Sequence, residues 1–415
     1  MRLTEEEQLM LNGERGPSVQ KAMEIQVQLG EIYGAECMIP VKSAHMPGAS
    51  IVVAGDGALK FIEEMGNHCE KFAAFTTLNT GAVDMDRPEE VGFSEEAVKK
   101  QQRLTCAYEK MGAIACHTCT PYFIGHVPKK GEHLAWGESS AIAFVNSVLG
   151  ARTNREGGPA ALAAAITGRV PAYGYHLDEN RKGNFIINVR CELSDVSDFG
   201  SLGYWVGKRV ESGVPVFTGI PADTDLDQLK MLSAALASSG SVALFHVVGL
   251  TPEAPTLEAA MGGNKAVEVY EFTKKEMDEA NRQLNKHSGQ PVSLVALGCP
   301  HSSLREIIRI AELLKDKKVK AHFWVLTSQP IKHLAERSGY AQIIEAAGAK
   351  LVVDTCTVLG EMAEPMRRTG MTAMATNSAK LAHYAPGQWN IPTYYGTTEQ
   401  CVNAALKGVF ENDQH

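Results

Sequence analysis

The chain has 415 residues, 44% of them apolar, with a formal net charge of −8 and a pI near 5.9. That length exceeds one ordinary core, and the acidic balance disfavours nucleic acid and anionic membrane surfaces as partners. The first 16 residues lack the apolar core of a signal peptide, and no apolar run of about 18 residues could span a membrane, so a cytoplasmic protein is expected. Nine cysteines, an odd number, favour free thiols over a disulfide framework.

The first part of the chain alternates helices with short strands, as α/β proteins do. Thr4 and Glu7 have the spacing of a capping box at the start of the first predicted helix. The predicted helices cover residues 4–13, 17–34, 57–65, 94–111 and two halves of 137–169, and the predicted strands cover 37–41, 72–78 and 113–118, with a turn at 45–48.

The later part predicts a regular parallel sheet. A polar linker at 287–291 precedes it, and we expect domains over 1–200, 201–290 and 291–415. Before the linker, the predicted strands cover 185–189 and 241–248 and a predicted helix covers 273–286. After it, the predicted strands of the parallel sheet cover 292–298, 321–327, 350–354 and 370–376, and the predicted helices cover 303–314 and 332–347. Ligands of such sheets bind at the carboxyl ends of the strands.

Three cysteines lie in turns rich in Gly, Pro and Thr: Cys119, Cys299 and Cys356. Three thiolates can hold an iron–sulfur cluster and leave one iron without a protein ligand, and that iron would be a Lewis acid. Cys116 and Cys119 form a C-x-x-C pair, which by itself also suits zinc, a redox pair or a nucleophile beside a histidine. No second ligand pair follows at the short spacing of a zinc site.

Several turns and helix starts could bind a carboxylate or a phosphate through backbone N–H groups, a hydroxyl, an amide or a cation. Each is equally compatible with an ordinary turn, surface loop or helix cap. The candidate residues are Gly48, Ala49, Ser50, Asn79, Thr80, Arg155 and Lys380.

Segments spread in order along nearly the whole chain, among them Gly298-Cys-Pro-His and Asp354-Thr-Cys, resemble the large subunit of the aconitase X family. The resemblance implies an α/β fold of aconitase-like three-layer domains with mostly parallel sheets, lacking the swivel domain. It matches Cys119, Cys299 and Cys356 to the three ligands of an iron–sulfur cluster, with 4Fe-4S expected and 3Fe-4S or 2Fe-2S as alternatives. The other matching segments begin at residues 39, 76, 119, 137, 146, 246 and 376.

The resemblance also implies a hydro-lyase that removes water from a small hydroxylated acid. The expected substrate is cis-3-hydroxy-L-proline, from the resemblance together with a small-residue anion pocket built from Gly48-Ala-Ser50 and Asn79-Thr80; (R)-5-phosphomevalonate is the alternative. Thr80-Gly follows Asn79 where the phosphomevalonate type more often has Pro. The catalytic base is expected on a small subunit that carries the swivel domain, so no catalytic residue is assigned in this chain. An RNA-binding iron sensor and a zinc hydrolase are less favoured.

Overall fold

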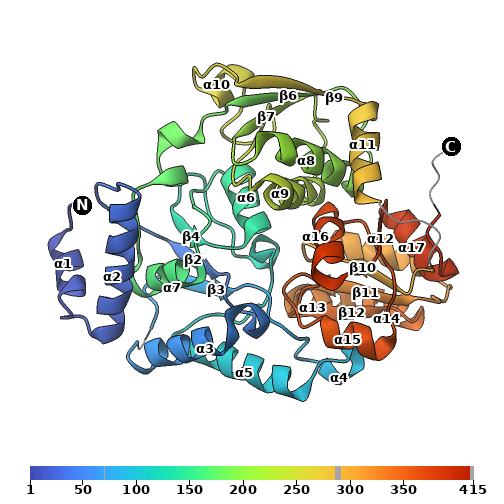
Figure 1. The fold of residues 1–415 in the computed structure, drawn as a ribbon, viewed down its shortest axis with the longest axis horizontal. Helices are drawn as coiled ribbons and strands as arrows, with labels where there is room; N and C mark the ends of the chain where they lie inside the picture. Colours follow the sequence, from blue (N-terminus) through green and yellow to red (C-terminus); the bar gives the residue numbers. More distant parts are fainter. Residues whose placement is uncertain (70, 286–290, 412–415) are drawn as a thin grey trace.

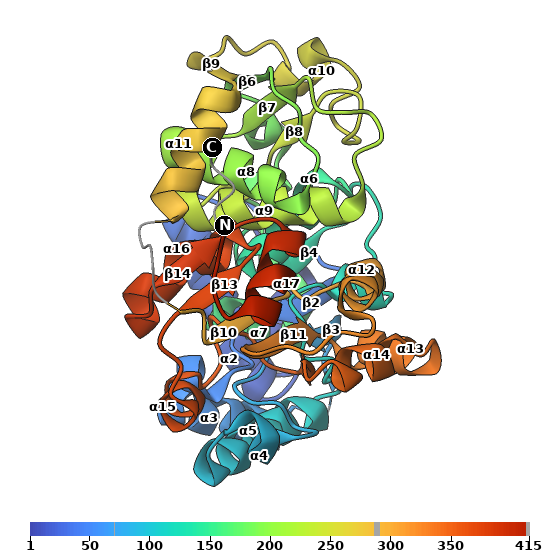
Figure 2. The same cartoon turned by 90° about the vertical axis from the view of Figure 1, so that its right-hand side faces the viewer.

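The computed structural model describes residues 1–69, 71–285 and 291–411. The chain forms three lobes that follow one another in sequence, coloured blue to green, green to yellow, and orange to red in Figure 1. Figure 2 shows the second lobe at one end of the molecule, above the third. Within the described part of the chain, none of the helices combines the length and the apolar character needed to cross a bilayer.

The first lobe has a parallel sheet of order β3-β2-β4 and an antiparallel pair, β1 with β5. Its central strand contains His45 and Met46, so the predicted turn at 45–48 is wrong for these two residues. The predicted strand 113–118 is also wrong: only Ile114 pairs, through a single bridge to Thr77. The elements are α1 Glu5–Leu11, α2 Pro17–Ile32, β1 Met38–Pro40, β2 Ser43–Met46, α3 Ile51–Asn67, β3 Phe75–Leu78, α4 Pro88–Val91, α5 Glu95–Lys110, η1 Pro121–Ile124, β4 Leu134–Trp136, α6 Ser139–Ser147, α7 Gly158–Thr167 and β5 Arg169–Pro171.

The second lobe packs two long helices against a parallel sheet of order β8-β7-β6-β9. Helices α8 and α9 touch backbone to backbone at Gly207 and Gly240, where any Cβ atom would collide with the facing helix. The predicted strand 241–248 shrinks to β8, and the predicted linker lies outside the described residues except for Pro291. The elements are η2 Gly174–His176, η3 Asp178–Arg181, β6 Phe185–Val189, α8 Val196–Val210, β7 Pro215–Thr218, α9 Leu226–Gly240, β8 His246–Val247, α10 Leu257–Met261, β9 Glu268–Phe272 and α11 Lys274–Leu284.

The third lobe is a five-stranded parallel sheet of order β12-β11-β10-β13-β14, covered by amphipathic helices. The predicted helix 332–347 is two helices, because Gly339 adopts a left-handed φ of +82° between them. The elements are β10 Leu294–Leu297, α12 Leu304–Leu314, β11 His322–Thr327, α13 Gln329–Arg337, α14 Tyr340–Ala346, β12 Lys350–Val353, α15 Ala363–Thr369, β13 Met374–Thr376, α16 Ala379–Trp389, β14 Thr393–Tyr395 and α17 Thr398–Lys407.

Buried hydrophobic clusters run across the boundaries between the lobes. One buried cluster joins Leu78 of the first lobe to Leu294 and Val352 of the third, and another joins Phe199 of the second lobe to Ala379. These shared clusters fix the positions of the lobes relative to one another, and so of the turns where the lobes meet. The predicted α/β fold with mostly parallel sheets is confirmed, and the three domain ranges remain a prediction.

Candidate active site

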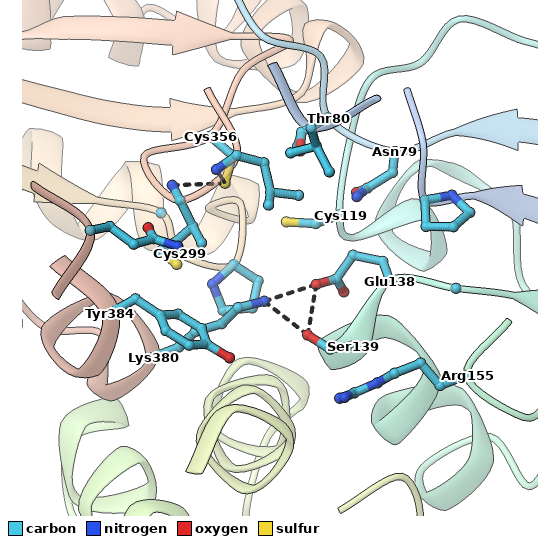
Figure 3. Close-up of a pocket in the computed structure, with 18 residues that line it drawn as sticks. Asn79, Thr80, Cys119, Glu138, Ser139, Arg155, Cys299, Cys356, Lys380 and Tyr384 are labelled. Carbon is cyan, nitrogen blue, oxygen red and sulfur yellow. Dashed lines mark hydrogen bonds and ion pairs between the residues drawn. The ribbon is translucent and has the colours of Figure 1, made fainter. Parts of the chain in front are cut away.

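The three cysteines predicted from turns line a single cavity of about 410 Å³. Cys299 follows β10 and Cys356 follows β12, at the carboxyl edge of the third sheet, and Cys119 comes from the turn before η1 in the first lobe (Figure 3). Gly298 adopts a φ of +96°, and a Cβ there would collide with the carbonyl oxygen of Leu326. Only glycine lets the chain turn so tightly against β11 and direct Cys299 into the cavity.

All three thiols are free, and backbone N–H groups point at two of the sulfur atoms. The N–H of His301 donates to Cys119 Sγ at 3.2 Å, and those of Val358 and Leu359 donate to Cys356 Sγ at 3.1 and 3.3 Å. Burial raises the pKa of Cys299 to about 12 and that of Cys119 well above its ordinary value, although the nearby Lys380 lowers both. The thiols are thus protonated until a positive partner displaces the protons.

Cys116, the other member of the C-x-x-C pair, is turned away from this centre. Its Sγ donates to the carbonyl oxygen of Leu78 at 3.3 Å, and it does not line the cavity. In the described part of the chain, no three His, Cys, Asp or Glu side chains are grouped as ligands of one metal ion. The thiols instead surround a space larger than a single ion.

A buried ion pair faces the thiols across the cavity. Lys380 Nζ lies 2.8 Å from Glu138 Oε1 and donates to the hydroxyl of Ser139 at 3.2 Å (Figure 3). Burial would raise the pKa of Glu138, but Lys380, with hydrogen bonds from Ser140 and Ala141, lowers it to about 2. Burial would lower the pKa of Lys380, but Glu138 and the neighbouring thiols raise it well above its ordinary value. Both groups are therefore charged at neutral pH.

Asn79, Thr80 and Arg155 also line the cavity, as the sequence predicted of binding residues. Asn79 Oδ1 and Thr80 Oγ1 are buried and have no hydrogen-bond partner in the described structure. Arg155 is exposed, and its Nη2 donates only to the carbonyl of Ala237, at 3.3 Å. These groups keep hydrogen-bonding capacity for a ligand, and the binding role of each remains a prediction.

Gly48, Ala49 and Ser50 do not lie in the wall of this cavity. Gly48 lines a neighbouring apolar pocket of about 300 Å³, and Ser50 Oγ donates to the carbonyl of Leu359 at 2.7 Å. Sequence reasoning missed Glu138 and Tyr384, which do line it. Glu138 caps α6 by accepting from the N–H of Ala141 at 2.6 Å, so an acidic residue before a low-polarity helix was the available signal.

Comparison with known proteins places the chain in a family. Family models described as the aconitase X first, second and third domains match residues 1–179, 183–282 and 292–407. The phosphomevalonate dehydratase large subunit of Methanocaldococcus jannaschii is 44% identical over 408 residues, covering 97% of this chain and 99% of the relative. That of Methanothermobacter thermautotrophicus is 46% identical over 391 residues, covering 94% and 95%.

The cis-3-hydroxy-L-proline dehydratase of Pseudomonas aeruginosa is 35% identical over 412 residues, covering 98% of this chain and 70% of the relative. Among solved structures, the holo-form of Thermococcus kodakaraensis aconitase X superposes with a TM-score of 0.89 at 38% identity, covering 98% of this chain and 100% of that one. The predictions of the family and of a dehydratase are thereby confirmed. The chain belongs to the aconitase X family.

Proposed function

We propose that this chain is the large subunit of an iron–sulfur dehydratase that acts on 5-phosphomevalonate. The observation that carries the proposal is the 44–46% identity to phosphomevalonate dehydratase large subunits along nearly the whole chain. Identity to the hydroxyproline dehydratases is lower, at 34–35%. The comparisons therefore favour 5-phosphomevalonate, the alternative substrate, over cis-3-hydroxy-L-proline, which was the expected one.

The three thiols suit an iron–sulfur cluster. They are unpaired, they surround one space, and N–H groups donate to two of the sulfurs, as is typical of cluster ligands. When bound, the cluster would supply a Lewis-acidic iron that polarises a hydroxyl group. Cys119, Cys299 and Cys356 would hold it.

The other polar groups that line the cavity would each bind a different part of the substrate. The Lys380 ammonium beside the thiols stabilises negative charge at that end of the cavity. Asn79 and Thr80 offer polar atoms for hydroxyl or carboxylate groups. Among the described lining residues, Arg155 is the cation without a carboxylate partner, and its planar guanidinium fits a phosphate with two hydrogen bonds. A phosphorylated substrate spans these two ends.

The base that removes the substrate proton is proposed to lie on a partner chain. The relatives from Methanocaldococcus jannaschii and Methanothermobacter thermautotrophicus are named large subunits, which implies that each works with a small subunit. By the same reasoning, a small subunit with the swivel domain would complete this one. The cytoplasm is the proposed compartment.

The test is an anaerobic assay of the chain co-purified with its small subunit. The assembled enzyme should contain iron and sulfide and dehydrate 5-phosphomevalonate in competition with cis-3-hydroxy-L-proline. Turnover of hydroxyproline alone would overturn the substrate and leave the reaction class intact. Stoichiometric zinc without iron would overturn the cofactor.

Substitution at Arg155 tests the phosphate end separately. R155A should raise KM for the phosphorylated substrate by about 10- to 100-fold with little change in kcat, because it removes charged hydrogen bonds to a group remote from the reacting atoms. R152A is the matched control: Arg152 lies three residues away, outside the cavity, and is bonded to Asp178 and His176. Equal effects of the two substitutions would contradict the role of Arg155.

A further inference from the structure

One buried histidine connects all three cysteine turns. His301 belongs to the Cys299 turn, is 1% exposed, and has a hydrogen bond at every polar atom. Its ring Nε2 lies 2.8 Å from the carbonyl oxygen of Thr355, and its ring Nδ1 lies 3.0 Å from the hydroxyl of Thr118. Thr355 precedes Cys356 and Thr118 precedes Cys119, so the ring bridges the other two turns one residue from each thiol.

The bonding pattern fixes the tautomer of the neutral ring. Thr355 offers a carbonyl oxygen, which only accepts, so Nε2 must carry a hydrogen and donate. In the neutral ring Nδ1 then accepts from the Thr118 hydroxyl, whose oxygen in turn accepts from the N–H of Thr120 at 3.2 Å. Donors and acceptors match along the whole chain of bonds.

The backbone of His301 adds two further links. Its N–H donates to Cys119 Sγ at 3.2 Å, and its carbonyl oxygen accepts from Lys230 Nζ at 3.3 Å. Lys230 is fully buried on α9, where it also pairs with Glu306 and Asp227. This single residue therefore receives contacts from the first, second and third lobes.

We infer that His301 is a positioning residue that holds the three cysteine turns at one fixed separation, and that it thereby sets how tightly the cluster is retained. The inference rests on the iron–sulfur cluster of the proposed function. Residues that hold metal ligands in place through hydrogen bonds typically change metal affinity by about 10- to 100-fold when they are replaced. His301 holds three ligand-bearing turns through its hydrogen bonds.

The test measures cluster retention instead of turnover. Wild type, H301A, H301Q and T118V are reconstituted anaerobically with iron and sulfide, and the loss of visible absorbance to an iron chelator is followed over time. H301A should lose iron at least about tenfold faster than wild type. H301Q should be intermediate, because its amide can still donate to Thr355 and accept from Thr118, but its flexible side chain does not hold the two partners at one spacing as the rigid ring does. T118V, which removes only a hydroxyl, should shift the rate in the same direction.

A second buried histidine provides the matched control. His246 is 2% exposed, and its Nε2 lies 2.7 Å from the carbonyl of Arg181, away from the cysteine turns. H246A should lower the melting temperature of the metal-free protein as H301A does, yet leave chelation at the wild-type rate.

Three results would overturn the inference. The first is equal chelation rates in wild type and the 301 variants, and the second is equally fast loss in H246A and H301A. The third applies if H301A does not fold: the inference is then overturned if T118V loses iron to the chelator at the wild-type rate. A wild-type protein that takes up no iron would refute the proposed function as well, so the two failures are distinguishable.

Discussion

Replacing Lys380 with methionine would leave a carboxylate stranded away from water. Glu138 is 6% exposed, and it would keep its hydrogen bonds from Ser139 Oγ, Ser140 Oγ and the Ala141 N–H, at 3.2, 2.7 and 2.6 Å, but no cation. The fall in the pKa of Glu138 from an ordinary 4.5 to about 2 corresponds to about 3 kcal/mol. Removing one partner of a buried ion pair typically costs about 3–5 kcal/mol. K380M should therefore lower the free energy of unfolding by about 3 kcal/mol at pH 7.

Urea denaturation of the metal-free, reduced protein measures this loss. Since the folded pKa of Glu138 lies below its unfolded value, the stabilisation is complete above pH 4.5 and disappears as pH falls toward 2. K332M is the control, because the partner of Lys332, Asp86, is 40% exposed and can regain water. In an E138Q background, K380M should cost little.

Two results would refute this reasoning about the ion pair. One is a loss below about 1 kcal/mol in K380M, since a stranded buried carboxylate should cost more. The other is an undiminished loss in the E138Q background, since the two groups would then act independently.

Three other perturbations have definite expected outcomes. C119S should abolish iron binding measured after anaerobic reconstitution, whereas C116S should retain it; the reverse result would show that the wrong member of the pair was chosen. Burial raises the pKa of Glu156 to about 7, so the folded protein holds a proton that the unfolded chain has released, and stability falls as pH rises from 4.5 to 7. E156Q should remove this fall, so that its free energy of unfolding exceeds that of wild type by up to about 3 kcal/mol at pH 8. Parallel pH profiles of the two proteins in thermal unfolding would contradict this prediction. G298A should lower the free energy of unfolding by about 3 kcal/mol or more, because of the left-handed φ and the backbone collision. G387A, where a Cβ would meet open space, should not lower it. Similar melting temperatures of the two variants would contradict this prediction.

The third lobe was the part of the fold most accessible to prediction. Strands such as Leu294–Leu297 are short, fully buried apolar runs, and α12 has a clear apolar face and a capping box at Ser303. The sequence pattern and the packing agree there. Because turns after parallel strands meet at one edge, two of the three cavity thiols followed from the strand order alone.

Other parts depend on contacts that a sequence does not display. Strand β2 contains the polar residues Ser43 and His45, yet both are buried, where Trp136 donates to Ser43 Oγ and Thr77 Oγ1 bonds His45 Nδ1 across the sheet. Helices α8 and α9 were missed. Glycines such as Gly203 and Gly207 weaken the helical pattern of α8, although they allow the close packing against α9. The partnership of Glu138 with Lys380 spans 242 positions of the chain, and no local pattern encodes it.

The division of the thiols between two lobes has a consequence for biosynthesis. Cys119 leaves the ribosome 180 residues before Cys299 and 237 before Cys356, and domains generally fold in the order of their synthesis. A nascent chain that has folded only its first lobe presents one of the three cavity thiols and an open cavity wall. The three-thiol cavity is complete only when the last sheet docks, so the proposed cluster would be loaded after the whole chain is made, and a truncated or stalled chain would lack two of its three ligands.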